Sequence, residues 1–367
     1  MPFSAVDAIS PAVEHTRRQL FQPFRFGQWV RLALVGLLAG ELSGGGCNIP
    51  HIPNMNIPRH PGPEHFLAPT LGGVDPVLYA GLIATLAVSA FFLSVIFMYI
   101  SSVMRFVLFD SLLAKECHIR RGWSERQGPG WRLFLWKLFF ALVAFAALIV
   151  VVAIPAAFAY GLGWFSPPSE HVVPLVLGGI ALFFVIAFLV LATAVIYVLT
   201  KDFVVPQMAL ENIGALEAWR RLLVMMQAEK ARYAGYLGLK ILLAICAAII
   251  IGIIGFILGL IILIPVAGVA IAAVIAAKSA GVGWTASTIT LAIVAGCAVL
   301  GIFLVLTALI SVPAIVFFPA YSMYFFAARY PRLAVALYPA PVTPQIPPAL
   351  VPPIEPPPVP PAPEPAG

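Results

Sequence analysis

Charged residues are scarce in this chain. Asp, Glu, Lys and Arg make up only 10% of it and hydrophobic residues 62%, whereas a soluble domain carries about 25% charged residues. The mean hydropathy is +1.02. This composition excludes a soluble globular protein, and several apolar runs reach the roughly 20 residues that cross a bilayer as a helix. We therefore expect an all-α integral membrane protein whose first partner is the lipid bilayer.

Cysteine is also rare. The chain has four cysteines, no two of which have CxxC spacing: Cys47, Cys117, Cys246 and Cys297. A disulfide framework is therefore excluded as the organising principle of the fold.

Motifs of known chemistry are missing as well. The sequence contains no GxSxG, HExxH, P-loop or paired-carboxylate motif. The centres of the second to sixth predicted spans contain no ionisable residue, although such residues usually mark functional sites inside membranes. No basic surface is interleaved with aromatic residues, which argues against nucleic-acid binding. We predict no catalytic residue and no cofactor, and charge-coupled transport is disfavoured.

Six membrane spans are predicted in a domain of residues 26–338. The second span has a strong start signal, with Asp75 as N-cap and Pro76 at the first helical position. Beyond the fifth span, residues 266–277 are apolar but too short to cross, which favours a re-entrant or interfacial segment. Pro313 and Pro319 should break the last run, leaving an irregular or interfacial continuation from about 312 to 328. The spans are about 26–42, 76–104, 133–160, 172–200, 236–264 and 285–311.

Positive charge indicates how the chain crosses the membrane. All but Arg59 and Lys278 of the 21 Lys and Arg residues fall into four clusters between the apolar runs. Loops rich in Lys and Arg stay on the cytoplasmic side, so both termini are predicted to be cytoplasmic. No cleavable signal peptide is expected, and a bacterial inner membrane fits best. The Pro-rich segment 339–367 is predicted to be extended and disordered.

Three cytoplasmic stretches are predicted to be interfacial amphipathic helices, each leading into a pair of spans. In the N-terminal segment 1–25, Ser10 should cap a helix whose apolar stripe includes Val13, Leu20 and Phe24. The middle stretch, 112–127, should break near Arg121. The third stretch begins at Asn212 or Gly214, and its apolar stripe is Ile213, Leu216, Leu223 and Met226. Such helices either cover the end of the bundle or form a surface for a protein partner.

The loop 43–74 is predicted to lie on the outer side. Glu41 and Asp75 flank it, and they either line a vestibule for a cation or substrate or are solvated helix ends. Soft ligands within the loop suit copper or zinc, but their spacing matches no established template, so no metal site is predicted. These ligands are Cys47, His51, Met55, His60 and His65.

One stretch resembles a known family. Val204-Val205-Pro206, followed by Gly214-Ala215-Leu216-Glu217-Ala218-Trp219-Arg220-Arg221, is similar to the membrane domain attached to some glycerophosphodiester phosphodiesterases and to its stand-alone relatives. The segments Pro23–Trp29 and Pro319–Tyr324 also fit. The resemblance implies an integral membrane protein of unknown role. It does not imply phosphodiesterase activity, because that chemistry belongs to a soluble barrel domain that this sequence does not contain.

Three functional hypotheses remain. The first is a non-enzymatic protein that organises membrane or envelope components, or serves as an accessory to them, through its interfacial helices. The alternative is a transporter or channel for a neutral or amphiphilic, lipid-like solute. An enzyme acting on lipid head groups is the third. The sequence leaves the oligomeric state open.

Overall fold

The structure is a computed structural model that describes residues 4–41, 76–164, 171–279 and 286–338. In these residues the chain forms helices and turns without strands, which confirms the all-α prediction. The segment 43–74 with its soft ligands, Asp75, and the Pro-rich segment 339–367 lie outside the described residues.

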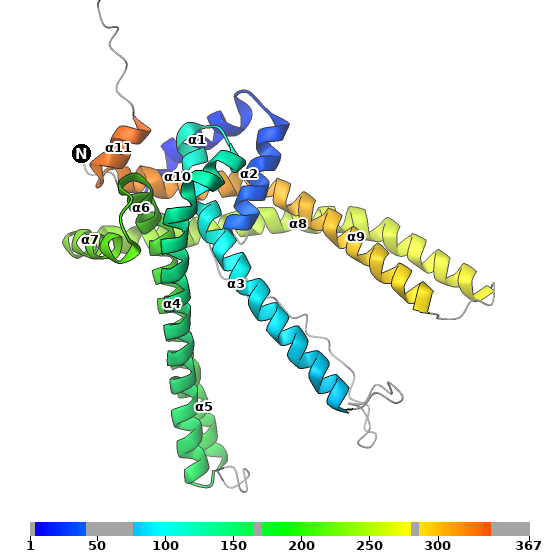
Figure 1. Ribbon diagram of the computed structural model, residues 1–367. Helices are drawn as coiled ribbons and strands as arrows, with labels where there is room; N and C mark the ends of the chain where they lie inside the picture. Colours follow the sequence, from blue (N-terminus) through cyan, green and yellow to red (C-terminus); the bar gives the residue numbers. More distant parts are fainter. Residues whose placement is uncertain (1–3, 42–75, 165–170, 280–285, 339–367) are drawn as a thin grey trace, which may run out of the picture.

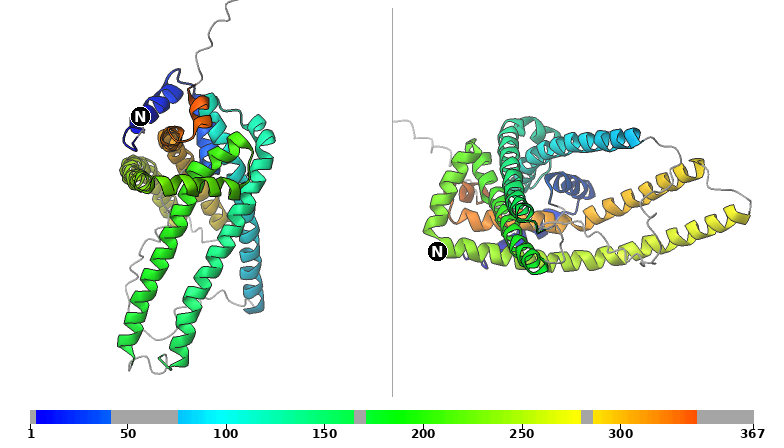
Figure 2. Two further views of the ribbon diagram at one scale, coloured as in Figure 1. Left: turned by 90° about the vertical axis from the view of Figure 1, so that its left-hand side faces the viewer. Right: turned by 90° about the horizontal axis from the view of Figure 1, so that it is seen from below.

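Five helices are long and apolar enough to cross a membrane. They leave one end of the molecule as three diverging arms: α3 alone, α4 beside α5, and α8 beside α9 (Figures 1 and 2). This arrangement confirms a membrane protein; the exact number of crossings stays a prediction. The five helices are α3 (Pro76–Ala114), α4 (Ile119–Gly161), α5 (Val172–Leu199), α8 (Lys230–Ser279) and α9 (Ala286–Ile310).

The arms bury almost nothing against the rest of the chain. In each of the five helices, the 18-residue window that qualifies it as a span is 0% buried. These windows expose Leu, Ile, Val and Phe side chains on every side. A helix that is apolar all round needs an apolar medium around it, so lipid is the natural surrounding of the arms.

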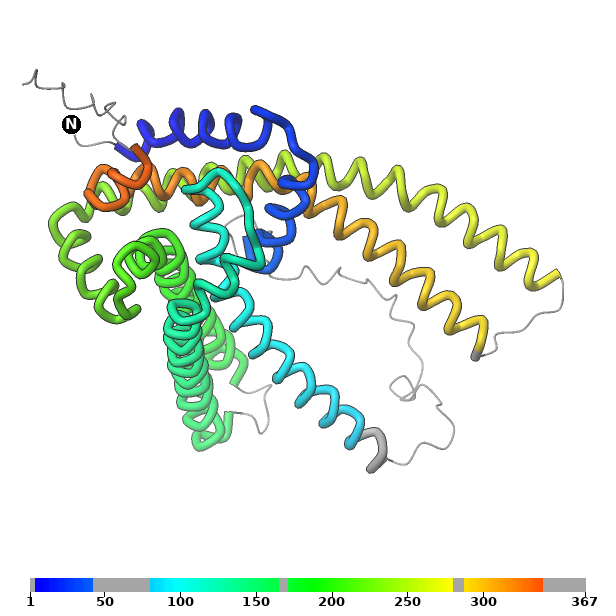
Figure 3. Tube along the Cα trace, turned by 45° about the horizontal axis from the view of Figure 1, so that its top comes forward, coloured from blue at the N-terminus to red at the C-terminus, as the bar shows by residue number. Residues whose placement is uncertain are grey.

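The arms meet in what we call the hub. It consists of six short helices, one π-helical turn and the adjoining ends of α3, α4, α5 and α8, and it contains nearly all of the buried core (Figure 3). The short elements are α1 (Ile9–Phe21), α2 (Phe26–Ala39), η2 (Thr200–Val204), α6 (Val205–Glu211), α7 (Ala215–Ala228), α10 (Val312–Ala327) and α11 (Pro331–Leu337).

Helix α10 runs through the centre of the hub. It contacts α1, α2, α3 and η2, and its buried residues extend from Val312 to Ala327. The expected helix break is observed at Ser311, but the continuation is a buried helix, so the prediction of an irregular or interfacial segment is wrong. Pro313 lies in the first turn, where a helix has no hydrogen bond to lose.

The helix that contains the fifth predicted span does not end at Pro265, where we expected it to end, although the end of the membrane crossing stays a prediction. Helix α8 continues through Pro265 to Ser279, so residues 266–277 are part of one 50-residue helix. A single proline removes one hydrogen bond and can be accommodated as a local bend. At about 1.5 Å per residue the helix is roughly 75 Å long, so it extends well beyond a bilayer core of about 30 Å.

Helix α2 accompanies only the last part of α3. The Gln28 amide donates to the Lys115 carbonyl at 2.7 Å, and the Ser101 hydroxyl donates to the Ala39 carbonyl at 3.3 Å. Gly40 then ends the helix in the left-handed conformation, with φ of 78°. The 14 residues of α2 therefore finish beside the hub end of α3, far from Pro76.

This geometry corrects the position of Glu41. The sequence prediction placed Glu41 at the outer interface beside Asp75, but its carboxylate lies inside the hub, paired with Arg105 and Lys201. An outer vestibule flanked by Glu41 is therefore ruled out.

Two of the three predicted amphipathic stretches differ from expectation. Of the apolar stripe predicted for α1, Leu20 is buried, but Val13 and Phe24 are exposed. The packed face of α1 also contains three polar residues, His15, Thr16 and Gln19. Ser10 lies inside the helix, and the N-cap is Ala8. The middle stretch was expected to break near Arg121, but the break falls at residues 115–118, before α4 begins. Gly122 packs against Val107 within the continuous helix α4.

Helix α7 matches its predicted start, with Gly214 as N-cap. Its Ala215, Ala218 and Leu222 face the hub. Leu216 and Leu223 of the predicted stripe are exposed, so part of that stripe points away from the chain.

The attachment of α1 should depend on pH. His15 contacts the Tyr324 hydroxyl and the Gln19 amide, both at 3.2 Å. Burial, and then the charge of Lys115, hold the pKa of His15 below its usual 6.5. Because the undocked helix binds the proton more readily, docking is complete above that usual value and weakens as the pH falls below it. We expect the protection factors of the α1 amides, which are their exchange rates corrected for the intrinsic effect of pH, to fall when the pH is lowered from about 7.5 to about 5.

The matched variants are His15→Gln, which should remove this loss of protection, and His118→Gln, which should keep it because His118 is exposed. Equal protection factors of the α1 amides in the wild type at both pH values would contradict the prediction.

Candidate functional site

Three related segments meet in the hub. Each lies where an arm reaches the hub: Phe106-Val107-Leu108-Phe109 near the end of α3, Phe203-Val204-Val205-Pro206 after α5, and Val316-Phe317-Phe318-Pro319 after α9. Corresponding residues of the three segments surround one cavity of about 30 Å³. This is consistent with three repeated units, each made of one of the predicted amphipathic stretches and the pair of spans that follows it. The cavity is lined by Glu41, Arg105, Leu108, Phe109, Lys201, Asp202, Val205, Pro206, Pro319, Ser322 and Met323.

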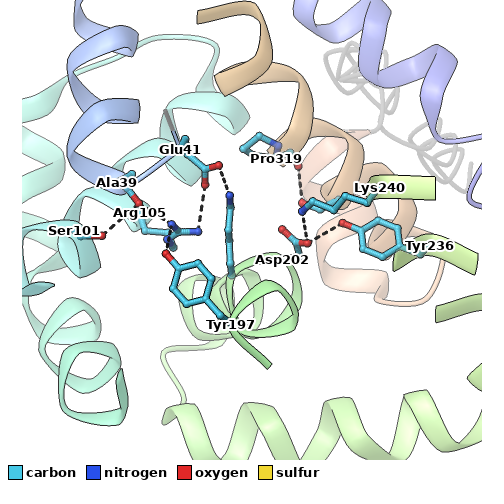
Figure 4. A network of polar contacts seen from close by, with 11 residues as sticks. Ala39, Glu41, Ser101, Arg105, Tyr197, Asp202, Tyr236, Lys240 and Pro319 are labelled. Carbon is cyan, nitrogen blue, oxygen red and sulfur yellow. Dashed lines mark hydrogen bonds and ion pairs between the residues drawn. The ribbon is translucent and has the colours of Figure 1, made fainter. Parts of the chain in front are cut away.

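The first polar group at the cavity is a buried triad. The Glu41 carboxylate lies 3.2 Å from Arg105 Nη1 and also pairs with Lys201 Nζ. All three side chains are less than one-tenth exposed. Arg105 Nη2 also donates to the Ala39 carbonyl at 2.6 Å and to the Tyr197 hydroxyl at 3.3 Å (Figure 4).

The second group consists of Asp202, Lys240 and Tyr236. The Asp202 carboxylate pairs with Lys240 Nζ and accepts a hydrogen bond from the Tyr236 hydroxyl at 2.9 Å. Asp202 and Lys240 are almost completely buried. This group joins the end of the α4–α5 arm to the start of the α8–α9 arm (Figure 4).

The π-helical turn η2 explains how two adjacent residues serve both groups. Its Thr200 carbonyl accepts from the Val205 amide, five residues later, which inserts an extra residue into the helix. Lys201 then reaches Glu41, while Asp202 reaches Lys240. Turns of this kind often occur at functional sites.

Lys137 adds another cation to the network. Its Nζ lies 6.0 Å from the centre of the Tyr197 ring, and Arg105 Cζ lies 5.7 Å from the same centre. The Tyr197 ring therefore interacts with two cations. Because the carboxylates are already held in ion pairs, the arrangement is suited to fixing charges and binding a small polar ligand.

Sequence reasoning missed this network. Each of its charges lies at the end of an apolar run, so none fell at a predicted span centre. A signal was nevertheless present, because Lys240 lies inside the predicted span 236–264 and a buried Lys requires a partner. Asp110, five residues after Arg105, does not belong to the network, because its bidentate partner is Arg126, at 2.6 and 2.8 Å.

Metal ligands do not gather in the described residues, where no group of three or more His, Cys, Asp and Glu side chains could hold an ion. The soft ligands of the loop 43–74 lie outside those residues.

Comparison with known proteins identifies one family. The profile of a family of unknown function (DUF7544) matches residues 3–336. The chain belongs to DUF7544. The match ends one residue before the end of α11, so the DUF7544 region contains the hub and all three arms. No curated protein and no solved structure matches the chain. The comparison shows no link to the membrane domain of glycerophosphodiester phosphodiesterases, and the role of DUF7544 is unknown.

Proposed function

We propose that this DUF7544 protein is a non-enzymatic membrane organiser or accessory protein. Its arms anchor it in the bilayer, and its hub holds a protein partner at one membrane face. The observation that carries the proposal is the uneven distribution of packing: the buried core is concentrated in the hub, whereas the apolar windows of the arms are 0% buried. A rigid hub on separate anchors is suited to positioning another molecule.

The same observation disfavours transport of a polar solute. Transporters form their substrate site between crossing helices that pack together near the middle of the bilayer. Here the three arms diverge (Figure 2), and the ionisable network lies at their common end.

Helix α7 is the proposed docking element. Leu216, Leu223 and Val224 are exposed and share one face with Arg220. The opposite face is packed against the hub through Ala218 and Leu222. Between the two faces, Trp219 stacks on Trp136 of α4 at a centroid distance of 5.9 Å. A fixed helix with an unpaired apolar edge is typical of helix-in-groove recognition, so a membrane-associated protein with an apolar groove is the expected partner.

The location follows from the charge distribution. The basic clusters lie in the hub and at its edges, whereas Lys278 lies at the far end of α8. The positive-inside rule then favours a cytoplasmic hub, with both termini on that side. A bacterial inner membrane is the proposed compartment.

The test compares two sets of substitutions in the full chain expressed in its native membrane. Changing Leu216, Leu223 and Val224 to Ser should remove a specific set of cross-linked partners. Changing two other exposed residues to Ser, Val6 before α1 and Val13 within it, should leave that set intact. An unchanged set with the α7 variant, or no cross-linked partner for the wild type, would refute the proposal.

A lipid-handling function is the second candidate, because one arm contains a cavity of lipid-like size. The cavity lies between α8 and α9 and has a volume of about 1030 Å³. Its lining is almost entirely apolar, and Lys278 adds one cation that could meet a lipid phosphate.

This candidate can be tested in liposomes with fluorescently labelled lipids. Gly296 lines the cavity, whereas Gly178 lies on α5. Faster transfer of lipid between leaflets than in empty vesicles, lost in Gly296→Trp and retained in Gly178→Trp, would establish lipid handling. Transfer equal to that of empty vesicles would exclude it.

A further inference from the structure

The charges around the hub cavity do not balance. Four cations belong to the network: Arg105, Lys137, Lys201 and Lys240. Two carboxylates, Glu41 and Asp202, pair with them. The nearby carboxylate of Asp110 is already held by Arg126. Among the described residues, the fully buried part of the network has three cations and two carboxylates, and the half-buried Lys137 adds a further positive charge. An excess of buried charge is costly unless something compensates it.

Arg105 also has donors to spare. Its side chain is buried and lines the cavity. Within the described residues its Nε has no hydrogen-bond partner, and its Nη1 has the Glu41 ion pair but no well-formed hydrogen bond. The guanidinium of Arg presents five N–H donors, so the cavity is bordered by unused donors that carry positive charge.

The size of the cavity limits what it can hold. A volume of about 30 Å³ accommodates one or two water-sized particles. A phosphate or sulfate group, with four oxygens around a central atom, is too large. A water molecule fits but leaves the excess charge uncompensated.

We infer that the hub cavity is a binding site for one small monovalent anion, such as chloride. Arg105 donates to the ion from the cavity wall, Lys201 lines the same wall, and Lys137 supplies charge from behind the Tyr197 ring. The ion would sit where corresponding segments of all three arms meet, so its binding would link the assembly of the hub to the salt around the protein. This inference does not depend on the proposed organising function.

The experiment measures the thermal unfolding midpoint of the full chain in detergent micelles. Chloride replaces gluconate at constant ionic strength, because gluconate is too large for the cavity and constant ionic strength removes general screening. Each tenfold increase in chloride above the dissociation constant should raise the folding equilibrium constant about tenfold, as expected for a single bound ion. Bromide should act like chloride, and sulfate should act like gluconate.

Two matched substitutions locate the effect. Lys137→Met removes a cation that has no carboxylate partner among the described residues, so the chain should still fold. Its apparent chloride affinity should drop about tenfold or more. Lys230→Met removes an exposed lysine at the start of α8 and should retain the wild-type response. Arg105→Gln should abolish the response where it folds.

The possible outcomes separate cleanly. If the wild type unfolds at the same midpoint in chloride, bromide and gluconate, the anion site is refuted. It is also refuted if Lys137→Met responds to chloride as strongly as Lys230→Met, since the ion would then bind elsewhere. A loss of the response in Lys137→Met alone supports the site.

Discussion

Replacement of Glu41 by Gln is expected to lower the free energy of unfolding by about 3–5 kcal/mol, the cost of leaving buried charge uncompensated. Glu41 is the shared partner of Arg105 and Lys201. A neutral amide keeps the shape of the side chain but leaves two buried cations without a carboxylate. The loss should therefore exceed that from an ordinary buried hydrogen bond, which is about 1 kcal/mol.

The measurement is reversible unfolding in micelles at a fixed chloride concentration, with Glu14→Gln as the control. Glu14 pairs with Arg18 on the exposed side of α1, so that change should cost less than about 1 kcal/mol. Similar losses for the two variants would mean that the Glu41 triad contributes no more than a surface pair.

The arms are the part of this fold that composition determines. Apolar runs such as 172–200 have only one stable form in lipid, a helix, because every backbone group must be paired within the segment. Helix α5 accordingly spans Val172–Leu199, close to the predicted range. Ser311 likewise separates two helices, as Pro313 indicated, but the predicted break at Pro319 is wrong because Pro319 lies inside α10.

The hub could not be predicted in the same way, because its contacts join distant parts of the chain. Helix α10 looked like an overlong span, since its residues are as apolar as those of an arm. Helix α10 differs from an arm only in its neighbours. For example, the Ile315 side chain lies so close to Gly36 of α2 that a Cβ atom at position 36 would overlap the Ile315 side chain. No local pattern in the sequence reports such a contact.

The candidate site shows the same limit. Each charged residue of the network lies at the end of an apolar run, where the sequence alone predicts a solvated interface residue. Only the tertiary arrangement brings the opposite charges together. The π-helical turn at Thr200–Val204 is equally invisible in the sequence, although it lets Lys201 and Asp202 reach different partners. The adjacent Lys and Asp, followed by Lys240 within the next apolar run, were the available clue.

A double-mutant cycle on Asp202 and Lys240 should reveal strong coupling. Asp202→Asn leaves Lys240 buried without its carboxylate, and Lys240→Met leaves the Asp202 carboxylate buried beside Tyr236. Each single change should cost about 3–5 kcal/mol, whereas removing both charges of a buried pair is often nearly neutral. We therefore expect the double variant to be at least about 2 kcal/mol more stable than the sum of the single losses predicts.

The same cycle on Glu14 and Arg18, an exposed pair, should give a coupling of only about 0.3–0.5 kcal/mol. Additive losses at Asp202 and Lys240 would show that the two side chains do not form a buried pair.

Strong coupling would instead mean that the arms α4–α5 and α8–α9 are joined by electrostatics at one point of the hub. Their helices could then diverge into lipid without contacts along their length, because the hub alone would fix their relative positions.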